Sequence, residues 1–418
     1  MSQRPNFILR PVEEHDRQPF LNMSRLAFMP MKTLAEMEQE LGDGPINPVE
    51  RKGWVVEDQA GNLVARYRHF EYSQYFAGVR FPMAGVSSVA VAIERRAQGV
   101  AQWMLAQALK NIREQDIPLS MLYPFRHSFY RKLGWAVAGI SHQYRVSSRV
   151  LPLYEERSRI VAYQPSQETD LKTLYSKVAT QHNGWIDRAS WTWENFFKPK
   201  GGRELYLYKE GETLQGYVVV DFAKLEPEKD QLAVLVREWV AQTPGAYRGL
   251  VGFLGTLRDQ VTTIVWNCPP DDPFPYLLTE QRHDPALTLP HLSFNFMRLF
   301  GMTSGGFMWR LVDPQRAIVL RPVRSLPPFK LSFHIADPVF GKEKFTVEFE
   351  NGRAQITPQP ATTVLRTSVD HLAELFSGLR RSQQLHWTGE LELEGEATLL
   401  AQLDAAWKTQ PPFCWDAF

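Results

Sequence analysis

Short apolar runs alternate with helical periodicities along the first third of the chain. The β-branched run Val86–Ala92 predicts a strand that leads into a helix. In that helix Leu105, Leu109 and Ile112 recur on one face, as expected for a helix that packs on a sheet. The predicted order is a strand at 7–12, helices at 16–26 and 33–41, strands at 54–57, 63–76 and 86–92, a helix after 99, and strands at 118–123 and near 137. This order predicts an α/β domain with a mixed sheet and one crossover helix.

The middle third repeats this order without repeating the sequence. Its pattern predicts a helix at 171–178, a hairpin of 205–209 and 216–221, a strand at 232–240, a helix at 246–257 and a strand at 263–266. The succession of hairpin, strand, helix and strand is the one found in the first third. We therefore expect a second domain of the same architecture.

The last third follows a glycine- and serine-rich segment at 301–306 and mixes antiparallel strands with helices. Glu350-Asn351-Gly352-Arg353 is a strong hairpin signal, because Asn-Gly adopts the positive φ angles of a tight turn. Ser368 is a candidate N-cap for an amphipathic helix that follows it. The fold class expected for the whole chain is α/β and α+β, with domains at 1–150, 151–300 and 301–418.

Composition excludes several classes of function. The 418 residues carry a net charge of only +1, so the charge balance predicts no nucleic-acid partner. The two cysteines, Cys268 and Cys414, are too few for a disulfide framework or a thiolate metal site, and we expect no metal. There is no run of about 18 apolar residues for a membrane span and no signal-peptide pattern at the N-terminus, so we expect a cytoplasmic protein.

The junction between the strand at 86–92 and the following helix carries candidate chemistry. Arg96–Ala101 fits the pattern Arg-x-x-Gly-x-Ala. The first amides of a helix have no intrahelical partner and lie at the positive end of the helix dipole, so a pyrophosphate can bind there. Gly99 allows close approach of the backbone, and Arg96 adds positive charge.

These features together resemble a known family. The order of elements, the Arg96–Ala101 loop and the segment Phe129-Tyr130-x-x-x-Gly134-Trp135 are similar to the GNAT acyl-CoA N-acyltransferases. Gly85–Val91 together with Arg96 and Gly99 resembles the enhanced intracellular survival (Eis) acetyltransferases. The resemblance implies two tandem GNAT-type mixed-sheet domains, the second degenerate, followed by a sterol carrier protein-like α+β domain. It also implies acetyl-CoA as co-substrate and a homohexameric assembly.

The resemblance further implies which residues hold the donor. The expected cofactor-binding residues are Val89, Ala90, Val91, Arg96, Ala97, Gln98, Gly99, Val100, Ala101, Gln102, Phe125 and Arg126. Ala97 and Gln98 stand where the family often has Arg, which makes this loop less basic than is usual. The corresponding segment of the second domain, Ala241–Ala246, lacks the pattern, so we expect no second acyl-CoA site.

Two residues are expected to move protons. Tyr130 is the candidate proton donor to the thiolate leaving group, with Tyr123 and Phe129 expected to be packing residues. The tail Gln410–Phe418 is aromatic rather than polar, so it should be buried, and burial makes a carboxylate a better base near neutrality. The resemblance implies that the terminal carboxylate of Phe418 is the proton acceptor.

The acceptors implied by the resemblance are amines: aminoglycosides, polyamines or lysine side chains. Asp416, Glu38 and Glu40 are candidates for an acidic acceptor pocket. Ala417 stands where relatives with marked aminoglycoside activity often have an acidic residue. Two other functions remain open, a lipid or sterol carrier and a non-catalytic assembly protein.

Two further polar segments have simpler interpretations. His182 and Asn183 lie at no ligand or triad spacing, so a local hydrogen-bonding role is expected for them. Asp271 and Asp272 stand between prolines and are expected to form a solvated turn.

Overall fold

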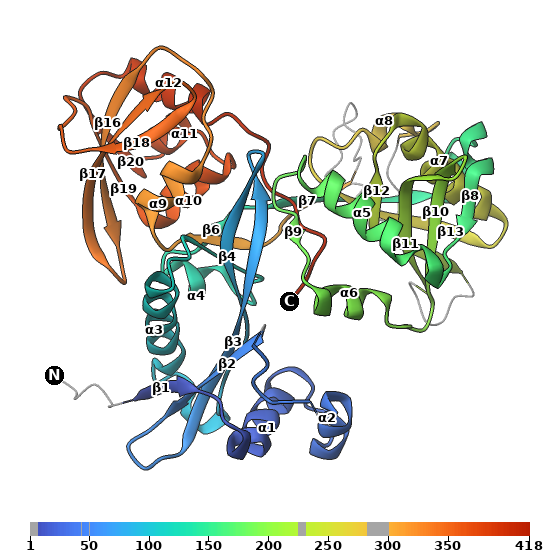
Figure 1. Cartoon of the computed structure of the whole chain (residues 1–418), viewed down its shortest axis with the longest axis horizontal. Coiled ribbons are helices and arrows are strands. Elements are labelled where there is room, and N and C mark those ends of the chain that lie inside the picture. Colours follow the sequence, from blue (N-terminus) through green and yellow to red (C-terminus); the bar gives the residue numbers. More distant parts are fainter. Residues whose placement is uncertain (1–6, 43, 50, 225–230, 282–300) are drawn as a thin grey trace, which may run out of the picture.

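The described part of the chain forms three β-sheets with helices packed against them (Figure 1). The structure is a computed structural model that describes residues 7–42, 44–49, 51–224, 231–281 and 301–418. The N-terminal residues 1–6, where no signal-peptide pattern was found, lie outside this range. Short 3-10 helices connect several elements, at Glu14–Asp16, Ile93–Arg95, Ser148–Val150, Glu155–Arg159, Pro165–Gln167 and Leu257–Asp259.

The first sheet is mixed and has the order β1-β2-β3-β4-β5-β15-β6, with β9 paired to β3. Its strands are β1 (Ile8–Pro11), β2 (Arg51–Glu57), β3 (Leu63–Phe76), β4 (Val79–Val91), β5 (Leu119–Leu122), β6 (Ala136–Val137), β9 (Ile186–Asp187) and β15 (Met308–Leu311). Its helices are α1 (Arg17–Phe28), α2 (Leu34–Leu41), α3 (Val100–Glu114) and α4 (His127–Arg131). Strands β1 to β4 are antiparallel, and α3 crosses over so that β5 runs parallel to β4.

The hairpin of β3 and β4 is longer than the sequence pattern predicts. The predicted third strand begins at Val86, whereas β4 begins at Val79. Ala77 and Gly78 have φ angles of 50° and 80°, the two positive values that a tight hairpin turn requires. The hairpin therefore extends from the sheet toward the second and third domains (Figure 1).

The second sheet repeats the arrangement of the first, as predicted. Its order is β14-β7-β13-β12-β11-β10-β8. Its strands are β7 (Ile140–Ser147), β8 (Ile160–Ala162), β10 (Arg203–Glu210), β11 (Thr213–Lys224), β12 (Leu232–Ala241), β13 (Val261–Cys268) and β14 (Met302–Gly305), and its helices are α5 (Glu168–Ala179), α6 (Ser190–Phe197), α7 (Pro244–Thr256) and α8 (Phe274–Leu277). Hairpin β10–β11, strand β12, crossover helix α7 and parallel strand β13 correspond to β2–β3, β4, α3 and β5.

Four strands join the sheet of a neighbouring part of the chain. Strand β9, from the middle third, pairs with β3 in the first sheet, and β14, from the last third, pairs with β7 in the second. Strand β15, which the sequence pattern assigns to the last third, lies between β5 and β6 in the first sheet. Strand β7, from the first third, pairs with β13 and β14 in the second sheet. The sheets therefore cross the expected boundaries at 150 and 300, which ties the domains together.

The third sheet is α+β in type, as predicted, with the order β18-β17-β16-β19-β20. Its strands are β16 (Phe329–Asp337), β17 (Gly341–Glu350), β18 (Arg353–Thr357), β19 (Val364–Ser368) and β20 (Leu391–Glu394), and its helices are α9 (Pro314–Leu320), α10 (Val369–Ser377), α11 (Ser382–Trp387) and α12 (Thr398–Ala406). Ser368 is the N-cap residue of α10, but its hydroxyl bonds the Asp370 carboxylate rather than the helix backbone. After α12 the tail leaves this domain and runs back between the first and second domains (Figure 1).

Candidate active site

Strands β4 and β5 separate partway along the first sheet. Their parallel pairing ends at Gly85, opposite Met121. Beyond Gly85, β4 continues to Val91 and pairs only with β3 among the described strands, so its other edge is open. A bulge at Ser88, where φ is 53°, interrupts the pairing with β3. An unpaired strand edge offers N–H and C=O groups to an extended ligand, and the predicted residues Val89–Val91 lie on this part of β4.

The predicted anion loop lies between this strand and α3. Gly99 is the N-cap residue of α3 in the left-handed conformation, with φ of 80°. A side chain added at Gly99 would meet no atom within 4 Å, so a ligand can approach the backbone of Val100–Gln102 freely. The 15-residue helix presents its first unpaired amides there. Ala97 also has a positive φ, 61°, which shapes the loop despite its side chain.

The two arginines of this loop differ in their contacts. The Arg95 guanidinium bonds Asp58 Oδ2 at 2.6 Å. Arg96 is exposed, and its Nε makes only a long contact of 3.4 Å to the carbonyl oxygen of Val91. Arg96 is therefore the cation of the two that can turn to a phosphate. Gln98 bonds the carbonyl oxygen of Glu94 at 3.1 Å, which orders the loop.

Tyr130 is buried in the short helix α4. Only 3% of its surface is exposed, and its ring lies 5.0 Å from that of Phe129 and 5.4 Å from that of Phe125. Burial raises the pKa of Tyr130 to about 12, so the phenol keeps its proton at neutral pH. Arg126 is the N-cap residue of α4, and the Phe125 side chain is 69% exposed beside it.

The last residue of the chain lies where β4 and β5 separate. The Phe418 ring is 5.2 Å from the ring of Tyr72, 5.8 Å from that of Phe70 and 5.9 Å from that of Tyr123. A side chain at Gly85 would lie 2.7 Å from the Phe418 ring, so the glycine makes room for it. The tail packs against the protein as its aromatic composition predicts, but of its aromatic residues only Phe413 is buried, and Trp415 and Phe418 are partly buried. No ring contact joins Phe418 to Tyr130.

Hydrogen bonds fix the tail just before this point. Tyr123, predicted to be a packing residue, also donates a hydrogen bond to the carbonyl oxygen of Asp416 at 2.9 Å. The Asn183 side chain bonds Thr409 Oγ1 and the carbonyl oxygen of Gln410, each at 2.7 Å. Asn183 has the expected hydrogen-bonding role, but the role is not local, because Thr409 and Gln410 are more than 200 residues away and the Ala77 amide, which donates to its Oδ1, is 106 residues away.

Asp416 is not free to bind an amine. Its Oδ1 accepts a hydrogen bond of 2.8 Å from Nε of Arg188, whose side chain is only 2% exposed. Glu40 likewise pairs with Lys32, and Glu38 accepts a hydrogen bond from Gln18. All three carboxylates suggested for an acceptor pocket are therefore already bound by other side chains.

The third domain holds the helix that carries Tyr130, which sequence reasoning did not predict. Arg131, the next residue, forms an ion pair with the buried Glu374 of α10. Arg310 donates from Nε to the carbonyl oxygen of Leu133 at 2.9 Å and is paired with the buried Asp337 at 2.5 Å. These partners lie 27 to 243 residues apart, so no sequence spacing could indicate them.

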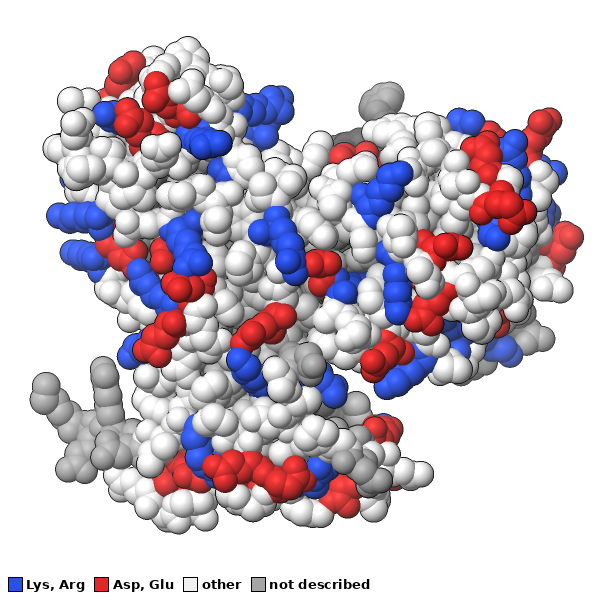
Figure 2. Space-filling view, in the orientation of Figure 1, with Lys and Arg blue, Asp and Glu red and all other residues white. Residues whose placement is uncertain are grey.

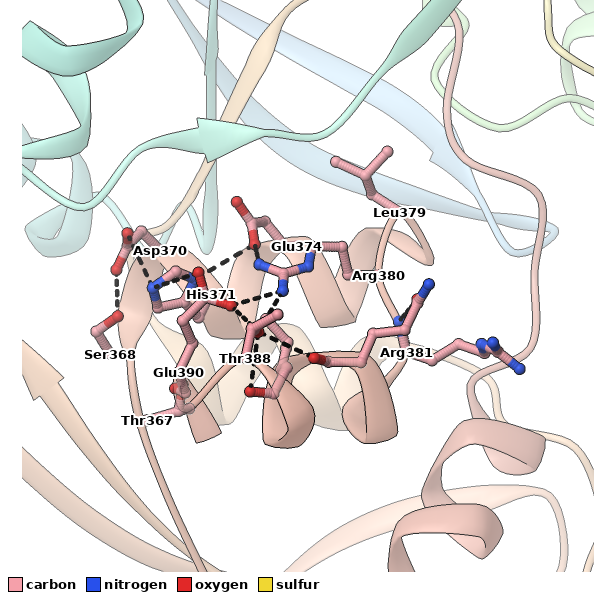
Figure 3. Close-up of polar contacts among 12 residues, drawn as sticks. Thr367, Ser368, Asp370, His371, Glu374, Leu379, Arg380, Arg381, Thr388 and Glu390 are labelled. Atoms are coloured by element: carbon pink, nitrogen blue, oxygen red, sulfur yellow. Dashed lines mark hydrogen bonds and ion pairs between the residues drawn. The ribbon is translucent and has the colours of Figure 1, made fainter. Parts of the chain in front are cut away.

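Glu374 belongs to a network of charges at the end of α10 (Figure 3). It lies 3.3 Å from Nδ1 of His371 and 3.1 Å from a guanidinium nitrogen of Arg380. Arg380 also bonds Glu390 at 2.5 Å. The hydrogen bond to Glu374 raises the pKa of His371.

The expectation of a solvated turn at Asp271 and Asp272 is wrong for Asp272. Its side chain is 7% exposed, and Oδ1 accepts hydrogen bonds from the Tyr247 hydroxyl at 2.7 Å and from the Phe274 amide at 2.9 Å. Burial raises the pKa of Asp272 to about 6. Flanking prolines are typical of an exposed turn, whereas the Asp272 side chain is buried and bonds the amide of the first residue of α8.

The described residues contain no group of three or more His, Cys, Asp or Glu side chains arranged to hold a metal ion. Within the same ranges, no helix is long and apolar enough to cross a membrane. Lys and Arg are interspersed with Asp and Glu over the face drawn in Figure 2. That face is hollowed between the α1 and α2 end of the first domain and the second domain.

Comparisons with protein families divide the chain into three parts. A family model described as an acetyltransferase (GNAT) domain matches residues 9–138, and a second model of the same description matches residues 184–302. A model described as a sterol carrier protein domain matches residues 314–415. The expected succession of two GNAT domains and a sterol carrier protein-like domain is confirmed.

Similar proteins cover nearly the whole chain. The N-acetyltransferase Eis of Mycobacterium tuberculosis is 24% identical over 378 residues, which are 86% of this chain and 87% of that protein. An uncharacterized N-acetyltransferase of Streptomyces griseus is 23% identical over 383 residues, covering 86% and 88%. The sequence resemblance to Eis proteins is confirmed.

Solved structures show the same fold. A GCN5-related N-acetyltransferase from Anabaena variabilis superposes with a TM-score of 0.82 at 22% identity, covering 99% of this chain and 100% of that one. Eis1 from Mycobacterium abscessus superposes with a TM-score of 0.77 at 19% identity, with the same coverage.

Proposed function

We propose that this N-acetyltransferase transfers the acetyl group of acetyl-CoA to an amine directly, within a ternary complex. The chain is similar to the Eis proteins and consists of two GNAT domains followed by a sterol carrier protein-like domain. The observation that carries the proposal is the meeting of three features at one opening. The free edge of β4, the start of α3 and the end of the chain all border the place where β4 and β5 separate.

The residues at this opening fit acetyl-CoA. The open space at Gly99 and the unpaired amides of Val100–Gln102 suit a pyrophosphate, with Arg96 as a nearby cation. The free edge of Val89–Val91 suits an extended amide-containing arm. Ala97, Gln98, Phe125 and Arg126 complete the proposed donor site. When bound, acetyl-CoA supplies an activated acetyl group as a thioester.

Two residues of the chain would move the protons. The terminal carboxylate of Phe418, directly or through a water molecule, accepts a proton from the ammonium group of the acceptor, which makes the nitrogen nucleophilic. Tyr130, which burial keeps protonated, donates a proton to the departing sulfur.

The acceptor and the assembly are proposed by similarity to Eis. The acceptors are amines such as aminoglycosides, polyamines or lysine side chains, and the assembly is a homohexamer in the cytoplasm. The third domain serves the structure rather than carrying lipid, because aromatic side chains fill the space on its sheet. Phe329 stacks on Phe349 at 4.5 Å, and both Phe333 and Phe376 lie against Trp407.

The release of CoA thiol with a panel of amines tests the proposal. The intact chain should release thiol with at least one amine, and a chain extended by a short C-terminal tag should lose most of this activity. The same tag at the N-terminus is the control and should leave the activity unchanged. Full activity of the C-terminally tagged chain would rule out the Phe418 carboxylate, and absence of acetyl-CoA binding would favour a carrier function.

The donor site has its own matched test. Arg96→Gln should raise KM for acetyl-CoA about tenfold, the order expected for loss of one charge-assisted contact to phosphate. Arg95→Gln removes a neighbouring positive charge that is already paired with Asp58, and should change KM much less. Equal effects of both variants would contradict the role assigned to Arg96.

A further inference from the structure

We propose that the opened strand pair of the second domain is the binding site of the chain's own C-terminal tail, and that Arg188 positions the tail through Asp416. This proposal rests on the proposed function, because the group that the tail delivers is the Phe418 carboxylate. It gives the second GNAT domain a role in the reaction of the first.

The second sheet opens in the same place as the first. Strand β12 pairs with β13 only as far as Val236, opposite Trp266, and then continues to Ala241. The pairing of β12 with β11 shifts at Arg237, as that of β4 with β3 shifts at Ser88. In the first domain the equivalent opening is the proposed acyl-CoA site.

In the second domain the chain itself lies at this opening. The Trp415 ring is 5.9 Å from that of Trp239, which lies on β12 beyond its pairing with β13. A cavity of about 360 Å³ is lined by Arg237 of β12, by Asn267 of β13 and by tail residues that include Trp415. The tail therefore lies between the two separated strands.

The start of the following helix explains why this opening does not suit a nucleotide. Pro244, at the first position of α7, has no N–H to donate. The Thr243 hydroxyl already accepts from the Ala246 amide at 3.2 Å. Two of the amides that could cradle a pyrophosphate are thus missing or occupied, and the opening is available for the tail.

Arg188 joins the tail to the second domain. It follows β9, and its guanidinium lies between Asp416 of the tail, at 2.8 Å, and Glu238 of β12, at 2.5 Å. The ring of Tyr175 lies 4.0 Å below it, and the Tyr175 hydroxyl is 3.3 Å from the other oxygen of Asp416. Burial by itself opposes the charge of Arg188, but the carboxylates of Asp416 and Glu238 raise its pKa well above the usual value.

The distance along the chain makes this contact relevant to catalysis. Phe418 is two residues beyond Asp416, so its Cα atom can lie at most about 7 Å from the Cα atom of Asp416. The Tyr123 hydroxyl, bonded to the carbonyl oxygen of Asp416, restricts it further. Arg188 is thus a positioning residue that acts on the Phe418 carboxylate through Asp416.

The test uses the full-length chain with Asp416→Ala, and with Asp416→Asn as a milder variant that keeps the shape and one hydrogen-bond acceptor. Hydrogen exchange of the amides of residues 413–418 measures how firmly the tail is bound in its site, independently of acetyl transfer. Steady-state kinetics report on positioning. Ala417→Ser is the control, because Ala417 is exposed and lies between Asp416 and Phe418.

For Asp416→Ala we expect faster exchange of the tail and a kcat lower by about 10- to 100-fold, as for displacement of a catalytic group by about 1 Å. KM for acetyl-CoA should stay within about twofold, because the donor is held by the first domain. Asp416→Asn should show smaller changes of the same kind, and Ala417→Ser none.

The outcomes separate this proposal from the proposed function. Unchanged hydrogen exchange of the tail amides in both Asp416 variants would overturn the proposed binding site of the tail. Faster exchange with a normal kcat would overturn the positioning role. If the unaltered chain acetylates no amine while the Asp416 variants loosen the tail, the proposed binding site of the tail is supported and the proposed function fails.

Discussion

Replacing Gly85 by alanine tests whether the position of Phe418 controls the reaction. The new methyl group would lie 2.7 Å from one ring carbon of Phe418, and 3.0 Å from a second ring carbon and from the ring of Tyr72. Carbon atoms make favourable contacts at about 3.5–4.0 Å, so the Phe418 ring must move by about 1 Å. Phe418 is the last residue and the easiest of these groups to displace. A displacement of this size in a catalytic group costs up to about 100-fold in rate.

The assay combines thiol release with thermal unfolding. Overpacking of this kind destabilises a protein by about 1–3 kcal/mol, so Gly85→Ala should lower Tm as well as kcat. Gly53→Ala is the matched control, because its methyl group would lie 2.6 Å from a side-chain carbon of Val12 in the same sheet, away from the tail. It should lower Tm by a similar amount and leave kcat near normal.

A second change at Phe418 sharpens the interpretation. Phe418→Leu removes the far edge of the ring but keeps the terminal carboxylate, so in the Gly85→Ala background it should recover part of the lost kcat. Such coupling between two substitutions is the signature of a direct contact. Normal kcat in Gly85→Ala, or an equal loss of kcat in Gly53→Ala, would refute the reasoning that places the Phe418 carboxylate at the reacting groups.

Three further changes test individual residues. Tyr130→Phe should lower kcat by about 10²–10⁴-fold, and a near-normal rate in this variant would contradict the role of Tyr130 as proton donor. In the unaltered chain, the Tyr130 pKa of about 12 predicts that deprotonation of this phenol causes no loss of rate between pH 8 and 10. Asp272→Asn should stabilise the protein at pH 8 but not near pH 4. The pKa of Asp272 in the folded state is about 6, above the ordinary 3.8, so the protonated carboxyl group favours folding at low pH. About 3 kcal/mol of folding stability is lost as pH rises through 6. Denaturant unfolding at the two pH values measures this. The raised pKa of His371 predicts stability that is present below pH 6.5 and is lost as pH rises through the folded-state pKa, so His371→Gln should flatten the dependence of Tm on pH between 6 and 9.

The order of elements could be predicted because hairpins and crossover helices are encoded locally. The turn at 59–62, the face of α3 and the Asn351-Gly352 turn all depend on neighbours in sequence. The exchange of strands could not be predicted in this way. Met308–Leu311 is an apolar run that suits any buried strand, and its place between β5 and β6 depends on packing that forms far away in sequence.

The candidate site divides along the same line. The loop at 96–101 is a local motif, and the aromatic tail indicated burial by its composition alone. The contacts that position the two proposed proton-transfer residues are not local, because Arg131 meets Glu374 and Arg188 meets Asp416 across 243 and 228 residues. One signal was present, since an arginine within a stretch as aromatic as 185–197 is typical of a buried cation against aromatic rings.

A chain terminus makes a demanding proton acceptor, because a free tail loses about 1–2 kcal/mol of conformational entropy for each residue that is ordered. The tail has no helix or strand after α12, so its order must come from contacts with other domains. Asn183 holds it at Gln410, Trp239 meets it at Trp415 and Arg188 binds it at Asp416. All three partners belong to the second domain. A second domain that bound a nucleotide at the β12–β13 opening could not hold the tail there, so the absence of an anion loop from this domain is a condition for the reaction that we propose in the first.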